Sequence, residues 1–253
     1  MFDFAGDSAG NRAAVVWSVL SREIDRYRED TGRPALSIVD VGGGSGAFAV
    51  PLAQLGHTVT VVDPSANALA SLAQRVEECE VDGKVTALQG DIDELPTLVA
   101  DGTADMVLCH NVLESVEEPE DALRALSDVS LPGGSVSLLV ANRAAAVLAK
   151  SLGGHFNDAL EILGTPDGVS GPGDTVRHRF ETATLTALVG SAGLATEQVH
   201  GVGVVDEYLP TAVGGGDRDS AGDLYRLERA IAARVPFRDI ASRLHLLARK
   251  RKV

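Results

Sequence analysis

The sequence predicts an α/β fold in which helices flank a mainly parallel β-sheet. Short apolar runs of strand composition alternate with segments of helical periodicity, which is the pattern of successive βαβ units. One apolar run, residues 36–41, leads directly into a glycine-rich turn and another helix. With 253 residues, 45% of them hydrophobic, the chain is long enough to bury a full core without disulfide bonds.

The first half of the chain contains the clearest elements. In order, we expect a helix at 11–30, a strand at 36–41, a helix at 47–55, a strand at 57–62, a helix from Ser65 to about Cys79, and strands at 85–88 and 106–109. Gly32 and Pro34 end the first helix, because neither residue favours its continuation. Ser65 is a suitable N-cap, because its hydroxyl can accept a hydrogen bond from the first turn.

The second half is less regular. We expect a strand at 135–140, a helix at 182–190, an extended segment at 194–205 and a helix at 224–233, whereas periodicity leaves 240–248 open between helix and strand. Between these elements, residues 143–179 are rich in glycine and proline and interrupt the alternation. Such a long insertion is either a flexible connector or a lid over a substrate.

Composition limits the class of protein. The two cysteines, Cys79 and Cys109, exclude a disulfide scaffold and favour a reducing compartment. No apolar run approaches the roughly 18 residues needed to span a bilayer. The first 17 residues contain acids where a secretory signal needs basic residues. We therefore expect a cytoplasmic protein with no membrane partner.

Charge is unevenly distributed along the chain. The net charge is −14, which argues against indiscriminate nucleic-acid binding. Residues 218–253, however, hold ten Lys/Arg and four Asp/Glu, a charge of +6, so the first 217 residues carry −20. This basic region is either an ordinary solvated edge or a surface that meets an anionic substrate.

The turn after the first strand has the features of a nucleoside site. Gly42 to Gly46 read Gly-Gly-Gly-Ser-Gly, and such glycines allow a ligand to approach the bare backbone. The helix that follows directs its N-terminal N–H groups to the same place. Asp63, 21 residues after Gly42 and at the end of the next strand, is placed to accept hydrogen bonds from both hydroxyls of a ribose.

The loop fits S-adenosylmethionine better than a dinucleotide. A dinucleotide fingerprint is G-x-G-x-x-G, but the sixth position here is Ala47. Asp40, two residues before the first glycine, would repel a pyrophosphate. A carboxylate there suits a ligand with an ammonium and a sulfonium group. We therefore expect Asp40, Gly42, Gly43, Gly44 and Asp63 to contact S-adenosylmethionine.

With these motifs, the sequence resembles the class I S-adenosylmethionine-dependent methyltransferases over nearly its whole length. Gln89 to Asp93 follow the third strand, where the family places groups at the adenine edge, so Asp91, Ile92 and Asp93 become candidates. The segments 105–110 and 131–134 resemble the family's fourth strand and the turn before its fifth. The resemblance implies a Rossmann-like fold with a seven-stranded sheet whose last strand, at 240–248, is antiparallel. It also implies one domain over 1–253, with a helical cap at 1–34 and the insertion at 143–179.

A closer resemblance is to the bacterial tRNA 5-carboxymethoxyuridine methyltransferases, which esterify a carboxymethoxy group on a wobble uridine. The matching pieces are Arg12 with Trp17, 40–46, 110–114, 132–138, Asn142, 154–156, 201–209 and 246–250. The family's cofactor contacts fall on Arg12, Gly42, Gly43, Asp63, Ile92, Asp93 and His110. A guanidinium such as that of Arg12 forks naturally onto the carboxylate of a methionyl group. The resemblance implies tRNA as the partner, no metal, and a role in tRNA processing.

The acceptor remains open at the level of sequence. Residues 164–174 of the insertion lack the basic residues expected for an RNA-modifying enzyme, so a small-molecule O- or N-methyltransferase is the alternative, and a cofactor-binding protein without catalysis is a third. A carboxylate acceptor is already ionised near pH 7 and needs no general base. A hydroxyl or amine acceptor would benefit from one, and His110, Glu114 and His155 are the candidates.

Overall fold

The computed structural model describes residues 8–209 and 218–252, with side chains at 14–209 and 222–252. The helices of these regions are α1 (Ser8–Thr31), α2 (Ala49–Gln54), α3 (Ala66–Glu78), α4 (Leu95–Leu98), α5 (Pro119–Val129), α6 (Arg143–Leu152), α7 (Phe156–Gly164), α8 (Thr182–Ser191) and α10 (Arg218–Ile231), with 3₁₀ turns at Ile92–Glu94, Asp206–Tyr208 and Arg238–Ile240. The strands are β1 (Ser37–Val41), β2 (Thr58–Asp63), β3 (Val85–Gln89), β4 (Ala104–His110), β5 (Ser130–Ala141), β6 (Leu194–Val202) and β7 (Arg243–Lys250). Within the described ranges, no helix combines the length and the apolar character required to cross a membrane.

The strands form one seven-stranded sheet in the order β3-β2-β1-β4-β5-β7-β6. The sheet is mostly parallel, and its antiparallel pairing lies on the β5-β7-β6 side. This arrangement confirms the predicted α/β fold. It also resolves the ambiguity at residues 240–248, because 243–248 belong to strand β7, whereas Ile240 ends a 3₁₀ turn.

The chain divides into two compact units. The first comprises residues 1–23, 139–185 and 198–246, and the second comprises 24–138, 186–197 and 247–253. The single domain expected over 1–253 and the helical cap expected at 1–34 stay predictions.

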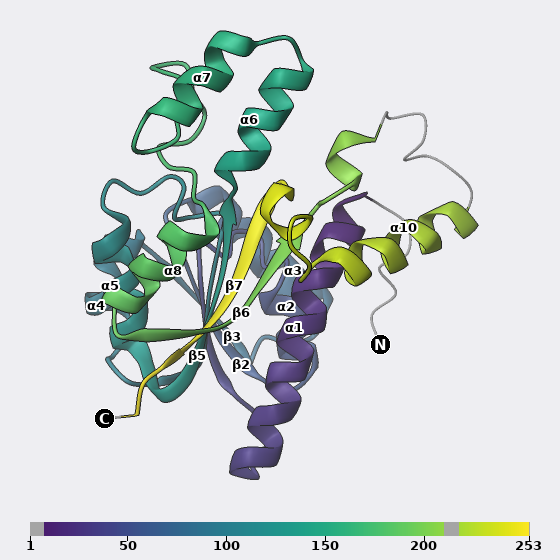
Figure 1. Ribbon diagram of the computed structural model, residues 1–253. Helices are drawn as coiled ribbons and strands as arrows, with labels where there is room; N and C mark the ends of the chain where they lie inside the picture. The colour runs from purple at the N-terminus through teal and green to yellow at the C-terminus, as the bar shows by residue number, and fades with distance from the viewer. Residues whose placement is uncertain (1–7, 210–217, 253) are drawn as a thin grey trace. The chain divides into compact units, whose positions relative to one another are not determined.

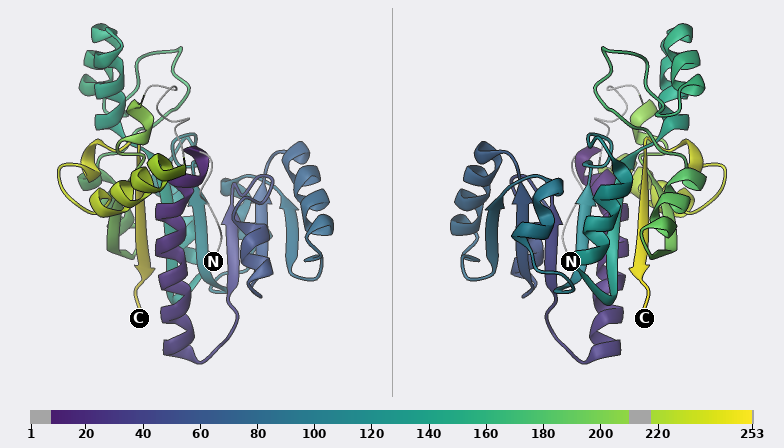
Figure 2. Two further views of the ribbon diagram at one scale, coloured as in Figure 1. Left: turned by 90° about the vertical axis from the view of Figure 1, so that its right-hand side faces the viewer. Right: turned by 90° about the vertical axis from the view of Figure 1, so that its left-hand side faces the viewer.

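The second unit is built on parallel strand pairs. Val39 of β1 lies opposite Thr60 of β2 and Val107 of β4, so β1 is hydrogen-bonded on both sides. Every residue of β4 is buried, as expected for a central parallel strand. Helices α2 and α3 pack against β2 and β3 (Figure 2), and α5 packs against β4. The carboxyl ends of β1, β2 and β4 therefore belong to one rigid core.

Local signals explain which helices the sequence predicts. Ser65 caps α3 as expected, its hydroxyl oxygen accepting a hydrogen bond from the N–H of Ala68 at 3.2 Å. Helix α5 was not predicted, although Pro119 stands in its first turn with two acids, a common helix start. Strand β5 begins at Ser130, so the segment 131–134, expected to be a turn before this strand, is part of it.

The insertion at 143–179 contains more structure than its glycine content indicates. It opens with α6 and α7, which lie side by side as a helical hairpin (Figure 1). Arg143, the first residue of α6, closes this hairpin, because its guanidinium donates to the carbonyl oxygens of Ile162 at 2.9 Å, Leu163 at 2.8 Å and Thr165. These carbonyls lie at the carboxyl end of α7, where a cation satisfies unpaired acceptors. The lid function stays a prediction.

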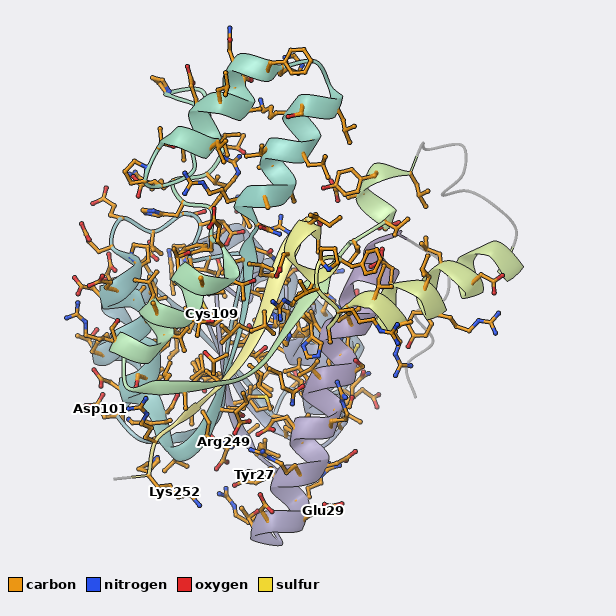
Figure 3. All side chains as sticks on the ribbon, viewed as in Figure 1. Tyr27, Glu29, Asp101, Cys109, Arg249 and Lys252 are labelled. Carbon is orange, nitrogen blue, oxygen red and sulfur yellow. The ribbon has the colours of Figure 1, made fainter. Side chains whose placement is uncertain are left out.

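The last strand uses two of its basic residues as internal anchors. Arg249, labelled in Figure 3, pairs with Glu197 at 2.5 and 3.0 Å and donates to the carbonyl of Gly133 at 2.7 Å. The ammonium of Lys250 donates to the carbonyls of Ser127 at 2.7 Å and Ser130 at 3.0 Å. These two cations are therefore committed within the protein, and the basic region expected at 218–253 offers fewer charges to a partner than the sequence suggests.

A buried carboxylate fastens the lower end of the second unit. Asp105, at the start of β4 and 3% exposed, accepts hydrogen bonds from the Tyr27 hydroxyl at 2.6 Å, the Ser37 N–H at 2.8 Å and Arg33 at 3.0 Å. Tyr27 lies near the end of α1 (Figure 3), and Ser37 begins β1. One side chain thus joins three consecutive parts of the unit.

We predict that Asp105→Ala lowers the free energy of unfolding by about 2–5 kcal/mol, because the partly buried Ser37 N–H and Tyr27 hydroxyl both lose the buried carboxylate that accepts their hydrogen bonds. Arg33→Ala is the matched control: its side chain is 55% exposed, so it should cost less than about 1 kcal/mol. Urea denaturation measures both values. Equal losses in the two variants would contradict the anchoring role of Asp105.

Candidate functional site

The glycine-rich turn of residues 42–46 follows β1 and is shaped by two requirements. Gly42, Gly44 and Gly46 have φ values of +70°, +55° and +79°, a region that favours glycine. A Cβ atom on Gly42 would lie 2.2 Å from Val112 Cγ2, and one on Gly46 would lie 2.4 Å from Leu72 Cδ1. At Gly44 the nearest atom would be an Asp63 oxygen at 3.8 Å. The outer glycines are therefore needed for packing, whereas a Cβ on Gly44 would meet only Asp63, at ordinary van der Waals distance.

Asp63, the last residue of β2, holds this turn in place. Its Oδ2 accepts a hydrogen bond from the N–H of Gly44 at 2.9 Å, and its Oδ1 accepts one from the N–H of Ser65 at 2.9 Å. The carboxylate is 8% exposed. Each oxygen still has a second acceptor position. Asp63 therefore links the glycine turn to the start of α3 and retains the capacity to accept hydrogen bonds from a ligand.

Asp40 lies beneath the same turn and is more deeply buried, at 2% exposure. A Cβ on Gly43 would lie 2.6 Å from Asp40 Oδ2, so the backbone passes directly over the carboxyl group. That oxygen has no hydrogen-bond partner among the residues that the structure describes. Burial, with the nearby charge of Asp63, raises the pKa of Asp40 to about 7. A buried carboxyl group, which can ionise to pair with a cation, therefore lies beneath the turn.

The end of β4 contributes a second part of the site. His110 is buried, its Nε2 lies 2.9 Å from Ser137 Oγ, and its ring meets Phe48 edge-on at a centroid distance of 4.8 Å. Burial lowers the pKa of His110 to about 3, so the imidazole stays neutral. Asn111 follows with φ +60°, an uncommon conformation that turns the chain sharply at the strand end.

Residues 91–93 form a capped turn after β3. The Oδ1 of Asp91 accepts a hydrogen bond from the N–H of Ile92 at 2.7 Å, and Glu94 accepts one from the N–H of Asp91 at 3.0 Å. Ile92 is buried, whereas Asp91 and Asp93 are exposed. Because both carboxylates are exposed to solvent, a ligand on the surface of this unit could contact them.

The remaining candidates are placed differently. Glu114 is 4% exposed and lies in the second unit with His110. His155 is exposed immediately before α7, in the first unit. Arg12 belongs to α1, but its side chain lies outside the described residues. Within the described part of the chain, no group of three His, Cys, Asp or Glu side chains could hold a metal ion.

Sequence reasoning missed Phe48 and Ser137, whose side chains contact His110. Ser137 is an interior residue of β5, and nothing in its local sequence distinguishes it from other strand positions. Phe48 follows the glycine turn by two residues, where the sequence indicates only a helix start. Their roles depend on tertiary contacts rather than on any motif.

Comparison with known proteins finds methyltransferases, the class of protein that the sequence motifs at this site predict. Residues 39–138 match a family described as a methyltransferase domain. The chain is 28% identical over 243 residues to tRNA 5-carboxymethoxyuridine methyltransferase of Escherichia coli (strain K12), covering 94% of this chain and 88% of the relative. It is 30% identical over 168 residues to ubiquinone biosynthesis O-methyltransferase of Xanthomonas euvesicatoria pv. vesicatoria (strain 85-10), covering 65% of each.

The fold is also shared with solved structures. Magnesium protoporphyrin IX methyltransferase (ChlM) from Synechocystis PCC 6803, crystallised with bound SAH, superposes with a TM-score of 0.59 at 18% identity, over 96% of this chain and 83% of that one. At this identity the likeness concerns the fold. The methyltransferase domain at residues 39–138 and the similarity to curated methyltransferases support the assignment of this chain as an S-adenosylmethionine-dependent methyltransferase.

Proposed function

We propose that this enzyme methylates the carboxyl group of a carboxymethoxy substituent on a wobble uridine in tRNA, giving the methyl ester. The observation that carries the proposal is the extent of the match to the E. coli tRNA methyltransferase, which covers 94% of this chain and 88% of the relative. The match to the ubiquinone O-methyltransferase covers 65% of each chain. Residues that select an acceptor usually lie outside the shared cofactor half, so the longer match is the more informative one.

S-adenosylmethionine would be held by the turn and the strand ends around it. We assign cofactor contacts to Asp40, Gly42, Gly43, Gly44 and Asp63 at the turn, and to Asp91, Ile92, Asp93, His110 and Arg12 beyond it. Two observations fit such a ligand: Asp40 Oδ2 is buried without a partner among the described residues, and a Cβ on Gly44 would meet only one atom, 3.8 Å away. A cationic ligand would place a positive charge next to the buried Asp40 carboxylate, which has none there in the described part of the free protein.

The cofactor, when bound, supplies a methyl group attached to a positively charged sulfur. A bond forms between an acceptor oxygen and the methyl carbon while the carbon–sulfur bond breaks, and the electron pair stays on sulfur. A carboxylate acceptor carries its charge before the reaction, so no proton has to move. The protein then acts by orienting the two groups and excluding water.

The weak basicity of His110 favours an acceptor that needs no deprotonation, such as a carboxylate. His110, with a pKa of about 3, is too weak a base to deprotonate a hydroxyl group near neutral pH. Its contact with Ser137 fixes the ring orientation instead. A small-molecule O- or N-methyltransferase remains the second candidate, favoured by the ubiquinone-type relative and by the net charge of −14. The cytoplasmic location expected from the sequence accords with a tRNA substrate and stays a prediction.

The test is methyl transfer from tritiated S-adenosylmethionine to two matched tRNAs, one with 5-carboxymethoxyuridine at the wobble position and one with unmodified uridine. We expect label in the first alone. Mild alkali should release that label as volatile methanol, because esters hydrolyse under conditions that leave N-methyl and ether groups intact. A small-molecule extract is assayed in parallel, and label confined to that extract would overturn the tRNA proposal.

We predict that S-adenosylmethionine binding weakens on acidification because Asp40 must be ionised to bind a cation. With a pKa of about 7 in the free protein, lowering the pH from about 8 to about 6 should raise the Kd about tenfold. Asp40→Asn should bind more weakly at pH 8 and remove this dependence. Calorimetric Kd values are compared as the ratio of variant to wild type, which cancels the titration of the ligand's own amino group. Parallel pH profiles would contradict the role of Asp40.

Two glycines of the turn provide a matched pair for the cofactor site. Gly44→Ala places its Cβ 3.8 Å from the nearest atom, so the cost to stability should be only about 1 kcal/mol, from the positive φ. Its S-adenosylmethionine Kd should nevertheless rise at least about tenfold, because the methyl group occupies ligand space. Gly42→Ala collides with Val112 and should lower the melting temperature far more. An unchanged Kd for Gly44→Ala would show that the turn does not face the ligand.

A further inference from the structure

The first unit contains a pocket of about 200 Å³ at the carboxyl end of β5. Its walls come from five parts of that unit, namely the end of β5, helix α6, the loop that contains Arg179, the 3₁₀ turn after β6 and the start of β7. Three alanines of α6, Ala145, Ala146 and Ala149, form one side, and their small side chains leave the space open. Nothing in the catalytic scheme above uses this pocket.

The pocket has a rigid floor. Asn142, the N-cap of α6, donates from its amide nitrogen to the carbonyls of Asp239 at 2.9 Å and Ala241 at 2.7 Å. Its Oδ1 accepts a hydrogen bond from the N–H of Ala144 at 3.1 Å. All three of these interactions are internal, so Asn142 fixes the relative positions of α6 and the segment before β7. The cavity is therefore a preformed feature of this unit.

Its polar lining includes Tyr208, Glu207 and two arginines, Arg179 and Arg243, besides Asn142 and Ser242. The Tyr208 hydroxyl donates to the carbonyl of Ile240 at 3.2 Å, which fixes the orientation of the ring. Arg179 is committed to a two-pronged pair with Asp174, at 2.6 and 2.8 Å, and to the carbonyl of Gly168 at 2.8 Å. It positions the loop that borders the pocket. Arg243, the first residue of β7, is the other cation of the wall.

Size and lining together indicate the kind of ligand. Small-molecule pockets usually measure roughly 300–1,000 Å³, so about 200 Å³ suits one small ring. An aromatic side chain offers a stacking surface for an unpaired base, and a guanidinium can pair with a carboxylate through two hydrogen bonds. Enzymes that act on a base in a folded nucleic acid receive it in such a pocket after it leaves the stack.

We infer that this pocket receives the uracil ring that carries the methyl-accepting carboxylate, with Tyr208 stacking on the ring and Arg243 pairing with the carboxylate. The inference rests on the proposed function and extends it to the acceptor. Both side chains belong to the first unit, whereas the proposed cofactor contacts other than Arg12 belong to the second. Substitutions in the pocket should therefore affect the acceptor and spare the cofactor.

The test measures two ligands in each variant: S-adenosylmethionine and the free nucleoside 5-carboxymethoxyuridine, both by calorimetry, with KM and kcat for the modified tRNA alongside. Arg243→Gln should weaken nucleoside binding and raise KM by about 10- to 100-fold, while the S-adenosylmethionine Kd stays within about twofold. It should also abolish the preference for 5-carboxymethoxyuridine over 5-methoxyuridine, which lacks the carboxylate. Arg243→Lys keeps the positive charge but not the two-pronged geometry of the guanidinium. Its KM and nucleoside Kd should lie between those of the wild type and Arg243→Gln.

Tyr208 and a distant arginine supply the controls. Tyr208→Ala should weaken nucleoside binding at least about tenfold, and Tyr208→Phe, which keeps the ring, should stay within about twofold. Arg226→Gln removes the same charge from a side chain that is 79% exposed on α10 and should change neither ligand. Melting temperatures confirm that each variant is folded. If Arg243→Gln does not fold, Arg243→Lys replaces it in the test.

The outcomes separate this inference from the proposed function. If wild type methylates tRNA but Arg243→Gln, Arg243→Lys and Tyr208→Ala all behave like wild type, the pocket assignment is overturned and the function stands. If the wild-type protein transfers no methyl group to tRNA, the proposed function is overturned. The pocket assignment is then tested by the nucleoside titration alone. Nucleoside binding that Arg243→Gln removes would then support the pocket, and absence of nucleoside binding to wild type would overturn it.

Discussion

The cofactor half depends on the way two carboxyl groups are used beneath one glycine turn. Asp63 binds the backbone of Gly44 and Ser65 and thereby fixes the turn, whereas Asp40 is buried next to it with an unpartnered oxygen. Because burial raises the pKa of Asp40 from its usual value to about 7, the fold favours its protonated form. The stabilising contribution of that proton is present at acid pH and is lost as the pH rises from about 4 to about 7. Near neutral pH the free protein therefore holds an unfavourable charge that a cationic ligand relieves.

The elements with local signals were predictable, and those that depend on tertiary contacts were not. Helix α3 has an N-cap serine, and its bounds agree with the sequence. The segment 131–134 was expected to turn, yet it continues β5, because Gly134 allows the strand to pass close to the carbonyl oxygens of Ala104 and Asp105. Helices α6 and α7 were hidden by the glycines around them, and Arg143 supplies the contact that joins them. That contact spans about 20 residues and leaves no periodic trace in the sequence.

The candidate site divides in the same way. The glycine turn and both carboxylates follow from the order of strand, turn and strand, so short-range spacing was sufficient to find them. The acceptor pocket draws on residues from 141 to 243, and its tyrosine and arginines stand in unremarkable local sequence. In the proposed assignments, cofactor recognition thus depends on residues that are close in sequence, whereas acceptor recognition depends on residues from distant segments. The same difference explains why the cofactor was easier to identify than the acceptor.

The Asp105 anchor has a consequence for the way the chain is made. Tyr27 is synthesised 78 residues before the carboxylate that binds its hydroxyl. At roughly 5–20 residues per second, a ribosome needs about 4–16 s to cover that interval. Throughout this time the end of α1 lacks its partner, and β1 lacks the acceptor for Ser37. In the emerging chain, α1 and β1 therefore cannot form their hydrogen bonds with Asp105 until β4 has left the exit tunnel. Only then can this end of the unit reach its native structure.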